Sequence, residues 1–186
     1  MLIVVSVGTD HHRFDRLLEW VAVAADRVGA EVVAQSGSTP ALDGVECFDF
    51  VAADELAELM LRADAVVCHG GPGTIALARS ARHRPIVVAR DPRLGEHVDD
   101  HQLRFSAALA ADDVIDRAAS IEELVSLLAS PRSRLEARVD EASCNAVREF
   151  TMLIESLNAG QLPTRPWRSR FLLRRVHRSP DTPSSR

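Results

Sequence analysis

A segment near the middle of the chain combines glycine, histidine and threonine in an order suited to binding an anion. The apolar, β-branched residues 64–68 predict a buried strand, and helix-forming residues fill 74–82. Between them lies His69-Gly70-Gly71-Pro72-Gly73-Thr74, whose glycines allow close backbone approach while the proline stiffens the turn. Because free N–H groups at a helix start attract negative charge, we expect this turn to bind an anion such as a phosphate. The alternative is a strand-to-helix turn whose glycines serve packing alone.

Two further segments carry polar side chains where loops are expected to lead into helices. Gly8-Thr9-Asp10 follows the first predicted strand, and His97, His101 and Gln102 lie at the start of a helix predicted over 97–110. His97 and His101 would share a face of that helix, but no third ligand is indicated, so we expect no metal. Instead, these side chains are expected to hydrogen-bond a polar ligand held against the glycine turn. The alternative is that His101 and Gln102 only cap and solvate the helix.

Strands and helices are expected to alternate along the chain. Strands are predicted over 2–7, 31–35, 45–50, 64–68, 85–89 and 113–115. Helices are predicted over 14–28, 53–61, 74–82, 97–110 and 132–157, and after Ser120, which forms a capping box with Glu123. The first of these helices is expected to end at Gly29 and to have an apolar face made of Leu17, Leu18, Val21 and Ala25. This alternation predicts an α/β fold, a Rossmann-like doubly wound parallel sheet whose ligands bind at the carboxyl ends of the strands. The G-x-G-x-x-G fingerprint is missing, which argues against a dinucleotide-dependent oxidoreductase.

The 186 residues are 46% hydrophobic, which suits one domain with a sizeable core. We expect that domain to span 1–160, followed by a basic, partly disordered tail over 161–186. Residues 1–162 hold 15 arginines against 26 acidic residues, so the domain is a poor binder of nucleic acid. Residues 163–186 hold seven arginines against one aspartate, interleaved with Trp167 and Phe171. The tail is therefore expected to contact a partner or an anionic membrane; the alternative is a solubilising end.

Features of the chain that bear on its compartment favour the cytoplasm. No apolar run approaches the ~20 residues needed to span a bilayer. The start of the chain lacks a basic segment before its apolar residues, so it predicts a strand and not a signal peptide. The three cysteines, Cys47, Cys68 and Cys144, are far apart and lack ligand spacing, as expected of buried thiols in a reducing compartment. We expect a cytoplasmic protein, positioned by its tail at the inner face of the cell membrane.

The same three polar segments resemble a known family. Val5-Ser6-Val7-Gly8-Thr9-Asp10 looks like the opening of the soluble subunit of two-part, dolichol-pathway-type UDP-N-acetylglucosamine transferases and of their bacterial exopolysaccharide counterparts. The glycine turn matches that family's H-x-G-x-G-[ST] loop, and Asp100-His101-Gln102-Leu103 matches its N-H-Q-L helix start. All three are similar to the carboxyl-terminal half of the family 28 glycosyltransferases. The resemblance covers about 2–128, with the motifs in family order.

The resemblance implies the carboxyl-terminal half of a GT-B glycosyltransferase, which binds a UDP-sugar donor without a cofactor or metal. By analogy, Gly71, Gly73 and Thr74 would hold the diphosphate and Gly8 and Thr9 would wall the site. His101 and Gln102 would meet the sugar hydroxyls, while His69 and His97 would line the cleft. The full set of predicted donor-binding residues is Gly8, Thr9, His69, Gly70, Gly71, Gly73, Thr74, His97, His101 and Gln102. The chain differs from single-chain members in having apolar 75–78 where they carry a ribose-binding glutamate.

The resemblance also implies that this chain is half an enzyme. No residue can be singled out as the catalytic base, and the acceptor side would come from a second, membrane-anchored polypeptide. The expected function is therefore the donor-binding subunit of a heteromeric glycosyltransferase, inactive without its partner. It would transfer a hexose to a polyprenyl-diphosphate-linked acceptor in exopolysaccharide synthesis. The alternative is a non-catalytic nucleotide-binding module that supports another glycosyltransferase.

Overall fold

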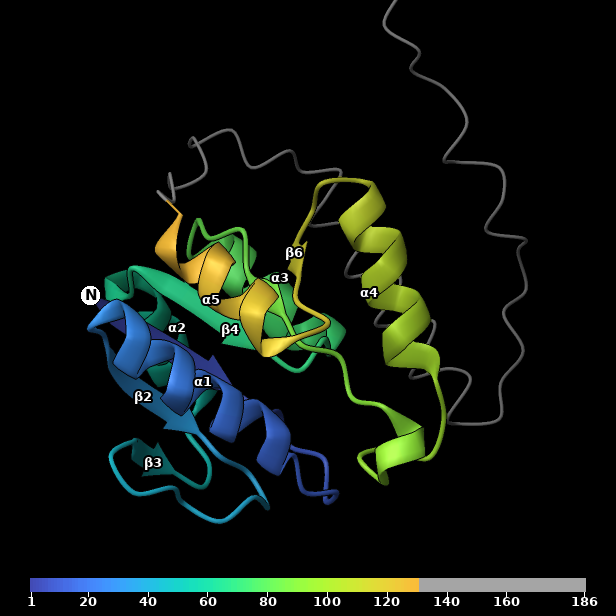
Figure 1. Cartoon of the computed structure of the whole chain (residues 1–186), viewed down its shortest axis with the longest axis horizontal. Coiled ribbons are helices and arrows are strands. Elements are labelled where there is room, and N and C mark those ends of the chain that lie inside the picture. Colours follow the sequence, from blue (N-terminus) through green and yellow to red (C-terminus); the bar gives the residue numbers. More distant parts are fainter. Residues whose placement is uncertain (131–186) are drawn as a thin grey trace, which may run out of the picture. The chain divides into compact units, whose positions relative to one another are not determined.

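A computed structural model describes residues 1–130, and these form an open six-stranded sheet flanked by helices (Figure 1). All strands pair in parallel, in the order β3-β2-β1-β4-β5-β6. The strands are β1 (Leu2–Ser6), β2 (Glu31–Gln35), β3 (Glu46–Phe48), β4 (Ala65–Cys68), β5 (Ile86–Val87) and β6 (Asp116–Arg117). This topology confirms the predicted Rossmann-like α/β fold, because each parallel pair needs a crossover connection.

Five α-helices and one short 3-10 helix connect the strands in the described part of the chain. They are α1 (Asp15–Val28), α2 (Ala53–Arg62), α3 (Pro72–Ser80), the 3-10 helix η1 (Pro92–Leu94), α4 (His101–Ala111) and α5 (Ile121–Ala129). Two ends have the caps expected from sequence. Gly29 ends α1 in the left-handed conformation, and the Ser120 hydroxyl accepts the Glu123 N–H at the start of α5. The Glu123 carboxylate in turn accepts the Ala119 N–H, one residue before the cap.

The core consists of two layers on opposite faces of the sheet, because side chains alternate along each strand. Ile3, Val5 and Val7 point to the face covered by α1 and α5, where they pack with residues such as Leu17 and Leu124. Val4 and Val66 point to the other face, against α2 and α3. A third cluster joins Cys68 and Val87 to Phe105 of α4. Figure 1 shows α1 and α5 side by side over one face.

Most predicted bounds lie within two residues of the observed ones, and the largest shifts are at α4 and β6. The helix predicted from 97 begins four residues later, because the Asp99 carboxylate accepts the His101 N–H and closes a turn just before it. The strand predicted over 113–115 is wrong by three residues. Asp113 has a φ of 58°, which cannot continue a strand, and Ile115 is buried in the core ahead of β6. Helix α3 begins two residues earlier than predicted, with Pro72 in its first turn.

Several predictions lie outside the described residues: the helix over 132–157, the domain boundary near 160, the basic tail and Cys144. Of the two described cysteines, Cys68 is buried as expected, whereas Cys47 on the edge strand β3 is only partly so. Among residues 1–130, every helix is too short or too polar to traverse a bilayer.

Candidate functional site

Three loops at the carboxyl edge of the sheet carry the predicted site residues. The strand order reverses between β1 and β4, and at such a point the loops that follow the two strands diverge to opposite faces. The loop after β1 runs from 7 to 14, the loop after β4 from 69 to 71, and the loop after β5 from 88 to 100. The Arg90 side chain donates to the carbonyl oxygens of Val7 and Glu96, and the Gly8 backbone lies against the His69 ring, so the three loops meet.

The glycines of the first two loops enclose the His69 ring. A β-carbon on Gly8 would lie 2.5 Å from Cε1 of His69, and one on Gly71 would overlap Nε2 of the same ring. Gly70 has a φ of 94°, a left-handed conformation in which an added β-carbon would also crowd Val87. Gly8, Gly70 and Gly71 therefore leave no room for a side chain where the loops pack around His69 and Val87.

His69 is held neutral beneath these loops. Its residue surface is 7% exposed, and burial, reinforced by the positive charge of Arg90, lowers the pKa of its imidazole to about 4. The ring Nδ1 lies 3.3 Å from the carbonyl oxygen of Ser6. Because a carbonyl only accepts, Nδ1 donates and Nε2 is left with a lone pair. His69 thus fixes the turn without adding charge to the site.

Gly73 differs from the other glycines of the turn. It is exposed in the first turn of α3, and a β-carbon added there would meet no atom of residues 1–130 within 4 Å. No side chain caps this helix, and its first backbone bond is donated by Ile75 to Gly71. The N–H groups of Gly73 and Thr74 precede that bond, and Pro72 has none. The start of α3 therefore offers backbone donors, beside open space, to a ligand.

Gln102 contributes a buried acceptor without a partner. The residue lies in the first turn of α4 and is 4% exposed, yet its Oε1 atom has no hydrogen-bond partner within the described structure. An unsatisfied buried acceptor costs about 1–3 kcal/mol, so a ligand hydroxyl that donates to it would gain that much. Neighbouring His101 is half-buried and hydrogen-bonded to Asp99. The remaining hydroxyl residues, Thr9 and Thr74, are exposed and half-buried respectively.

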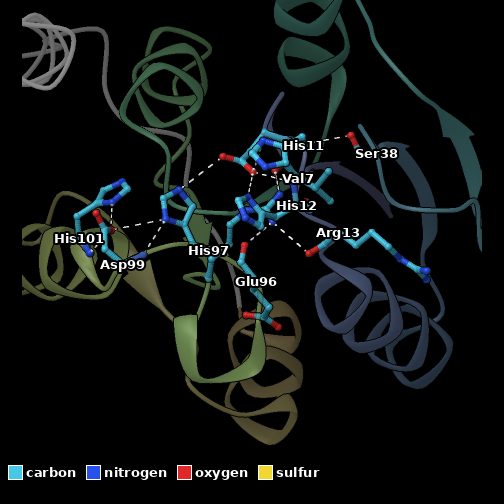
Figure 2. A network of polar contacts seen from close by, with 11 residues as sticks. Val7, His11, His12, Arg13, Ser38, Glu96, His97, Asp99 and His101 are labelled. Carbon is cyan, nitrogen blue, oxygen red and sulfur yellow. Dashed lines mark hydrogen bonds and ion pairs between the residues drawn. The ribbon is translucent and has the colours of Figure 1, made fainter. Parts of the chain in front are cut away.

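His97 lies in the loop before α4 and not on the helix, which corrects the prediction that it shares a helical face with His101. Its side chain is 11% exposed and stands between two carboxylates, with Nε2 3.5 Å from Asp10 and Nδ1 3.6 Å from Asp99 (Figure 2). Burial and the nearby His101 imidazole lower the pKa of His97. The rings of His97 and His101 still meet edge to face, with centroids 4.7 Å apart.

Arg90 positions two loops of the site and was not predicted from the sequence. It is fully buried over the Phe14 ring, with its guanidinium carbon 4.7 Å from the ring centroid. Its nitrogens donate to the carbonyl oxygens of Val7, His12, Arg13 and Glu96, at 2.8–3.2 Å. This one side chain therefore binds the loop after β1 to the loop after β5. The signal was an arginine directly after the apolar run 86–89, at the carboxyl end of a strand.

A bidentate ion pair reinforces the same junction. Arg16 donates to both carboxylate oxygens of Glu96, at 2.8 and 2.7 Å, and also to the Ala89 carbonyl. The pair borders a hollow of about 490 Å³ lined by Arg13, Asp15, Arg16, Leu94, Gly95 and Glu96. None of the predicted donor-binding residues lines this hollow, so it is separate from the open start of α3.

The chain is similar to solved glycosyltransferases at low sequence identity. It aligns with the calicheamicin glycosyltransferase CalG4 at 19% identity and a TM-score of 0.50, over 86% of this chain and 40% of that one. The alignment with the glycotransferase of kitacinnamycin has 18% identity and a TM-score of 0.52, and it covers 87% of this chain and 43% of that one. Arabidopsis thaliana UGT89C1, solved with UDP-L-rhamnose, aligns at 10% identity and a TM-score of 0.50, over 86% of this chain and 39% of that one. These similarities show the fold, and the chain spans about two fifths of each structure.

Sequence comparison is more specific than structural similarity here. No curated protein matches the chain at a significant level. The model of the glycosyltransferase family 28 C-terminal domain matches residues 2–157, which include all three polar loops and every element of the described sheet. The chain therefore belongs to the family of glycosyltransferase family 28 C-terminal domains.

Proposed function

We propose that this chain binds the UDP-sugar donor of a hexosyltransferase, with the donor diphosphate at the start of α3. One observation carries the proposal: the uncapped first turn at Gly73 and Thr74 opens beside free space where the strand order reverses. The positive end of a helix dipole and free N–H groups favour a bound phosphate. The same groups would stabilise the charge that builds on the departing diphosphate as the sugar is transferred.

The sugar of the donor is assigned to the start of α4. The unpartnered Oε1 of Gln102 can accept a hydrogen bond from a sugar hydroxyl, and His101 precedes Gln102 in the sequence. The ribose hydroxyls of the donor must form hydrogen bonds with residues other than 75–78. Ile75 and Ala78 are buried in the core, and no residue of that segment has a polar side chain.

The acceptor is assigned to a second polypeptide. The described loops all belong to one sheet and are assigned above to the donor. By resemblance to two-part transferases, we propose a membrane-anchored partner that presents a polyprenyl-diphosphate-linked acceptor at the cytoplasmic face of the membrane. The basic segment 163–178, with Trp167 and Phe171, is the proposed contact with that partner or with anionic lipid.

Calorimetric titration of the full chain with UDP and a panel of UDP-hexoses, in EDTA, tests the donor site. Gly73→Asp places a like charge against the diphosphate and should abolish binding; among residues 1–130 no atom lies within 4 Å of the new β-carbon, so the fold should tolerate the change. Ser80→Asp adds the same charge to the exposed last turn of α3 and is the matched control. Equal UDP affinity for wild type and Gly73→Asp would refute the assignment.

Reconstitution with the partner tests the division of labour. The chain alone should transfer no sugar to a lipid-linked acceptor, and the assembled pair should do so. Gly73→Asp should abolish transfer by the pair if this chain holds the reacting donor. If the pair keeps its full rate with that variant, the chain is instead a non-catalytic module that supports another transferase.

A further inference from the structure

The loop after β1 holds an aspartate–histidine pair to which the donor site gives no role. Nδ1 of His12 lies 2.6 Å from Oδ1 of Asp10, and the same oxygen accepts the backbone N–H of His12 at 2.7 Å (Figure 2). Asp10 therefore closes a short turn and holds the imidazole ring of that turn. An imidazole oriented by a carboxylate is a recurring arrangement in enzymes that use histidine as a general base.

The charge of Asp10 fixes the tautomer of His12. Burial opposes ionisation of Asp10, but the hydrogen bonds from His12 and the positive charge of Arg90 outweigh it and lower the pKa of the carboxyl. Because an ionised carboxylate only accepts, Nδ1 of His12 donates, and the lone pair of the neutral ring lies on Nε2. Among residues 1–130 no hydrogen bond engages Nε2, and the side chain is 23% exposed. The pair thus presents a basic nitrogen to a ligand.

His12 is also fixed through its backbone. Its carbonyl oxygen accepts from the fully buried Arg90 at 2.8 Å, so the side chain that joins the two loops also holds this residue. On one side the His11 ring packs against it, with centroids 4.0 Å apart. A group held in this way needs little reorganisation before it takes a proton.

The His12 ring lies on the sugar side of the proposed donor site. Its centroid is 5.8 Å from that of His97, and the His97 ring in turn meets the His101 ring at 4.7 Å (Figure 2). His101 and Gln102, at the start of α4, are the residues assigned above to the sugar hydroxyls. The three rings therefore connect the sugar end of α4 with the loop after β1.

A second pair of the same kind is a weaker candidate. Asp99 accepts from both the backbone N–H and the ring Nδ1 of His101. Its side chain is 56% exposed, however, whereas that of Asp10 is 28% exposed, and water competes for an exposed carboxylate. His101 is also assigned to the sugar itself. The geometry therefore favours the pair in the loop after β1.

We propose that His12, oriented by Asp10, is the general base that takes the proton of the acceptor hydroxyl. The proton moves to Nε2 of His12 while the acceptor oxygen forms a bond with the anomeric carbon of the donor sugar. The bond between that carbon and the diphosphate oxygen breaks, and its electron pair leaves with UDP. Asp10 stays ionised and stabilises the imidazolium that results. The proposal rests on the proposed donor site, and it assigns the base to this chain and not to its partner.

Sugar transfer by the reconstituted pair, at saturating UDP-hexose, tests the proposal. His12→Ala should lower kcat about 100-fold or more, while the affinity of the full chain for UDP-hexose, measured by calorimetry, stays at the wild-type value. Asp10→Asn keeps the shape of the side chain and removes its charge, so it should lower kcat about tenfold or more at unchanged affinity.

His11→Ala is the matched control for loss of an imidazole from this loop. The His11 side chain is 84% exposed, and its Nδ1 lies 3.8 Å from Asp10, beyond hydrogen-bond distance. This variant should keep the kcat and the UDP-hexose affinity of wild type. Circular dichroism checks that all three variants are folded.

Nitrogen NMR of the full chain tests the orientation of the base without a partner. The chain is labelled with ¹⁵N-histidine and measured at about pH 8.5, where an ordinary imidazole is neutral. The ring signals of His12, assigned by their loss in His12→Ala, should show the proton on Nδ1 and the lone pair on Nε2. Asp10→Asn should shift the proton toward Nε2, which a merely structural role of Asp10 would not do.

Three results would overturn the proposal: wild-type kcat in His12→Ala, a loss of UDP-hexose affinity in that variant large enough to explain its loss of activity, or a proton on Nε2 of His12 in the wild-type chain. The second result would make His12 a ligand of the donor. A chain that binds no UDP-hexose, or a wild-type pair that transfers no sugar, would instead refute the proposed function, so the two failures are distinguishable.

Discussion

The imidazole of His69 fills the space where Gly8 would carry a side chain, since a β-carbon there would lie 2.5 Å from Cε1 of the ring. Gly8 also has a φ of 84°, so two separate penalties meet at this residue. Gly44 has a φ of 81°, but no atom of the described residues lies within 4 Å of its β-carbon position, which makes it a control for backbone strain alone.

Gly8→Ala should therefore destabilise the protein more than Gly44→Ala. Left-handed backbone costs an alanine about 1–2 kcal/mol at either position, and crowding against a packed ring adds about 1–3 kcal/mol at Gly8. Urea unfolding followed by circular dichroism measures both free energies. Equal losses in the two variants would show that the His69 ring moves aside without cost.

Burial of neutral His69 should make stability fall in weak acid. Its pKa is about 4 in the folded protein and 6.5 in an ordinary imidazole, so the unfolded chain alone binds a proton between these values. Stability is then fully present above pH 6.5 and declines as the pH falls toward 4, by at most about 3 kcal/mol from this group.

Urea unfolding between pH 4.5 and 7.5, in EDTA, measures that decline in wild type and in His69→Gln. The variant should show a shallower pH dependence, since its amide donates to Ser6 without titrating. Asp10 and Asp99 have lowered pKa values and titrate below this window, and His97 remains in both proteins. Identical pH dependence in the two proteins would contradict the buried neutral imidazole.

Substitution of buried Arg90 should lower the free energy of unfolding more than substitution of an exposed arginine does. Lysine cannot reach four carbonyl oxygens at once, so Arg90→Lys leaves buried acceptors unsatisfied and should lower the free energy of unfolding by about 2–5 kcal/mol. Arg93→Lys is the control in the same loop, because that side chain is 83% exposed. The control should change stability by less than about 0.5 kcal/mol, as measured by urea titration. A tolerated Arg90→Lys would mean that water or a shifted backbone satisfies the carbonyls.

Removal of either polar residue at the start of α4 should discriminate between UDP and UDP-sugar. His101→Ala and Gln102→Ala each remove a hydrogen bond assigned to the sugar, which should weaken UDP-sugar binding about two- to tenfold and leave UDP unchanged. Arg104→Ala, an exposed change on the same helix, should affect neither ligand. Calorimetry measures the affinity of wild type and of each variant for both ligands. Parallel losses for UDP and UDP-sugar would move these residues to the nucleotide.

The elements predicted best were those whose apolar pattern is continuous and whose ends carry local signals. Strand 31–35 was correct at both ends, and α1 has its predicted apolar face and its glycine stop. In both cases the pattern reflects packing against the sheet, which dominates the local choice of structure. The glycine turn was recognisable because its residue types are unusual at any other kind of position.

The features missed depend on side chains that act over long sequence distances or against the backbone. The first turn of α4 is displaced by the Asp99 carboxylate, and the last strand by left-handed Asp113. Arg90 could not be found from composition, since arginine is rarely buried and its partners are about 6–83 residues away in sequence. The sequence also could not tell that Gly8 and Gly71 make room for the His69 ring whereas Gly73 does not contact it, because that difference depends on the three-dimensional packing of the loops.

The packing of α5 on α1 has a consequence for how the chain folds. Leu124 and Leu128 complete the same core layer as Leu17 and Val21, although about a hundred residues separate them. During synthesis, α1 can pack against β1 and β2, but the side chains that it shares with α5 stay exposed until the rest of the sheet has been made. Contacts of such long range slow folding and expose apolar surface meanwhile. The nascent chain is therefore expected to depend on a holding chaperone until residue 129 has emerged.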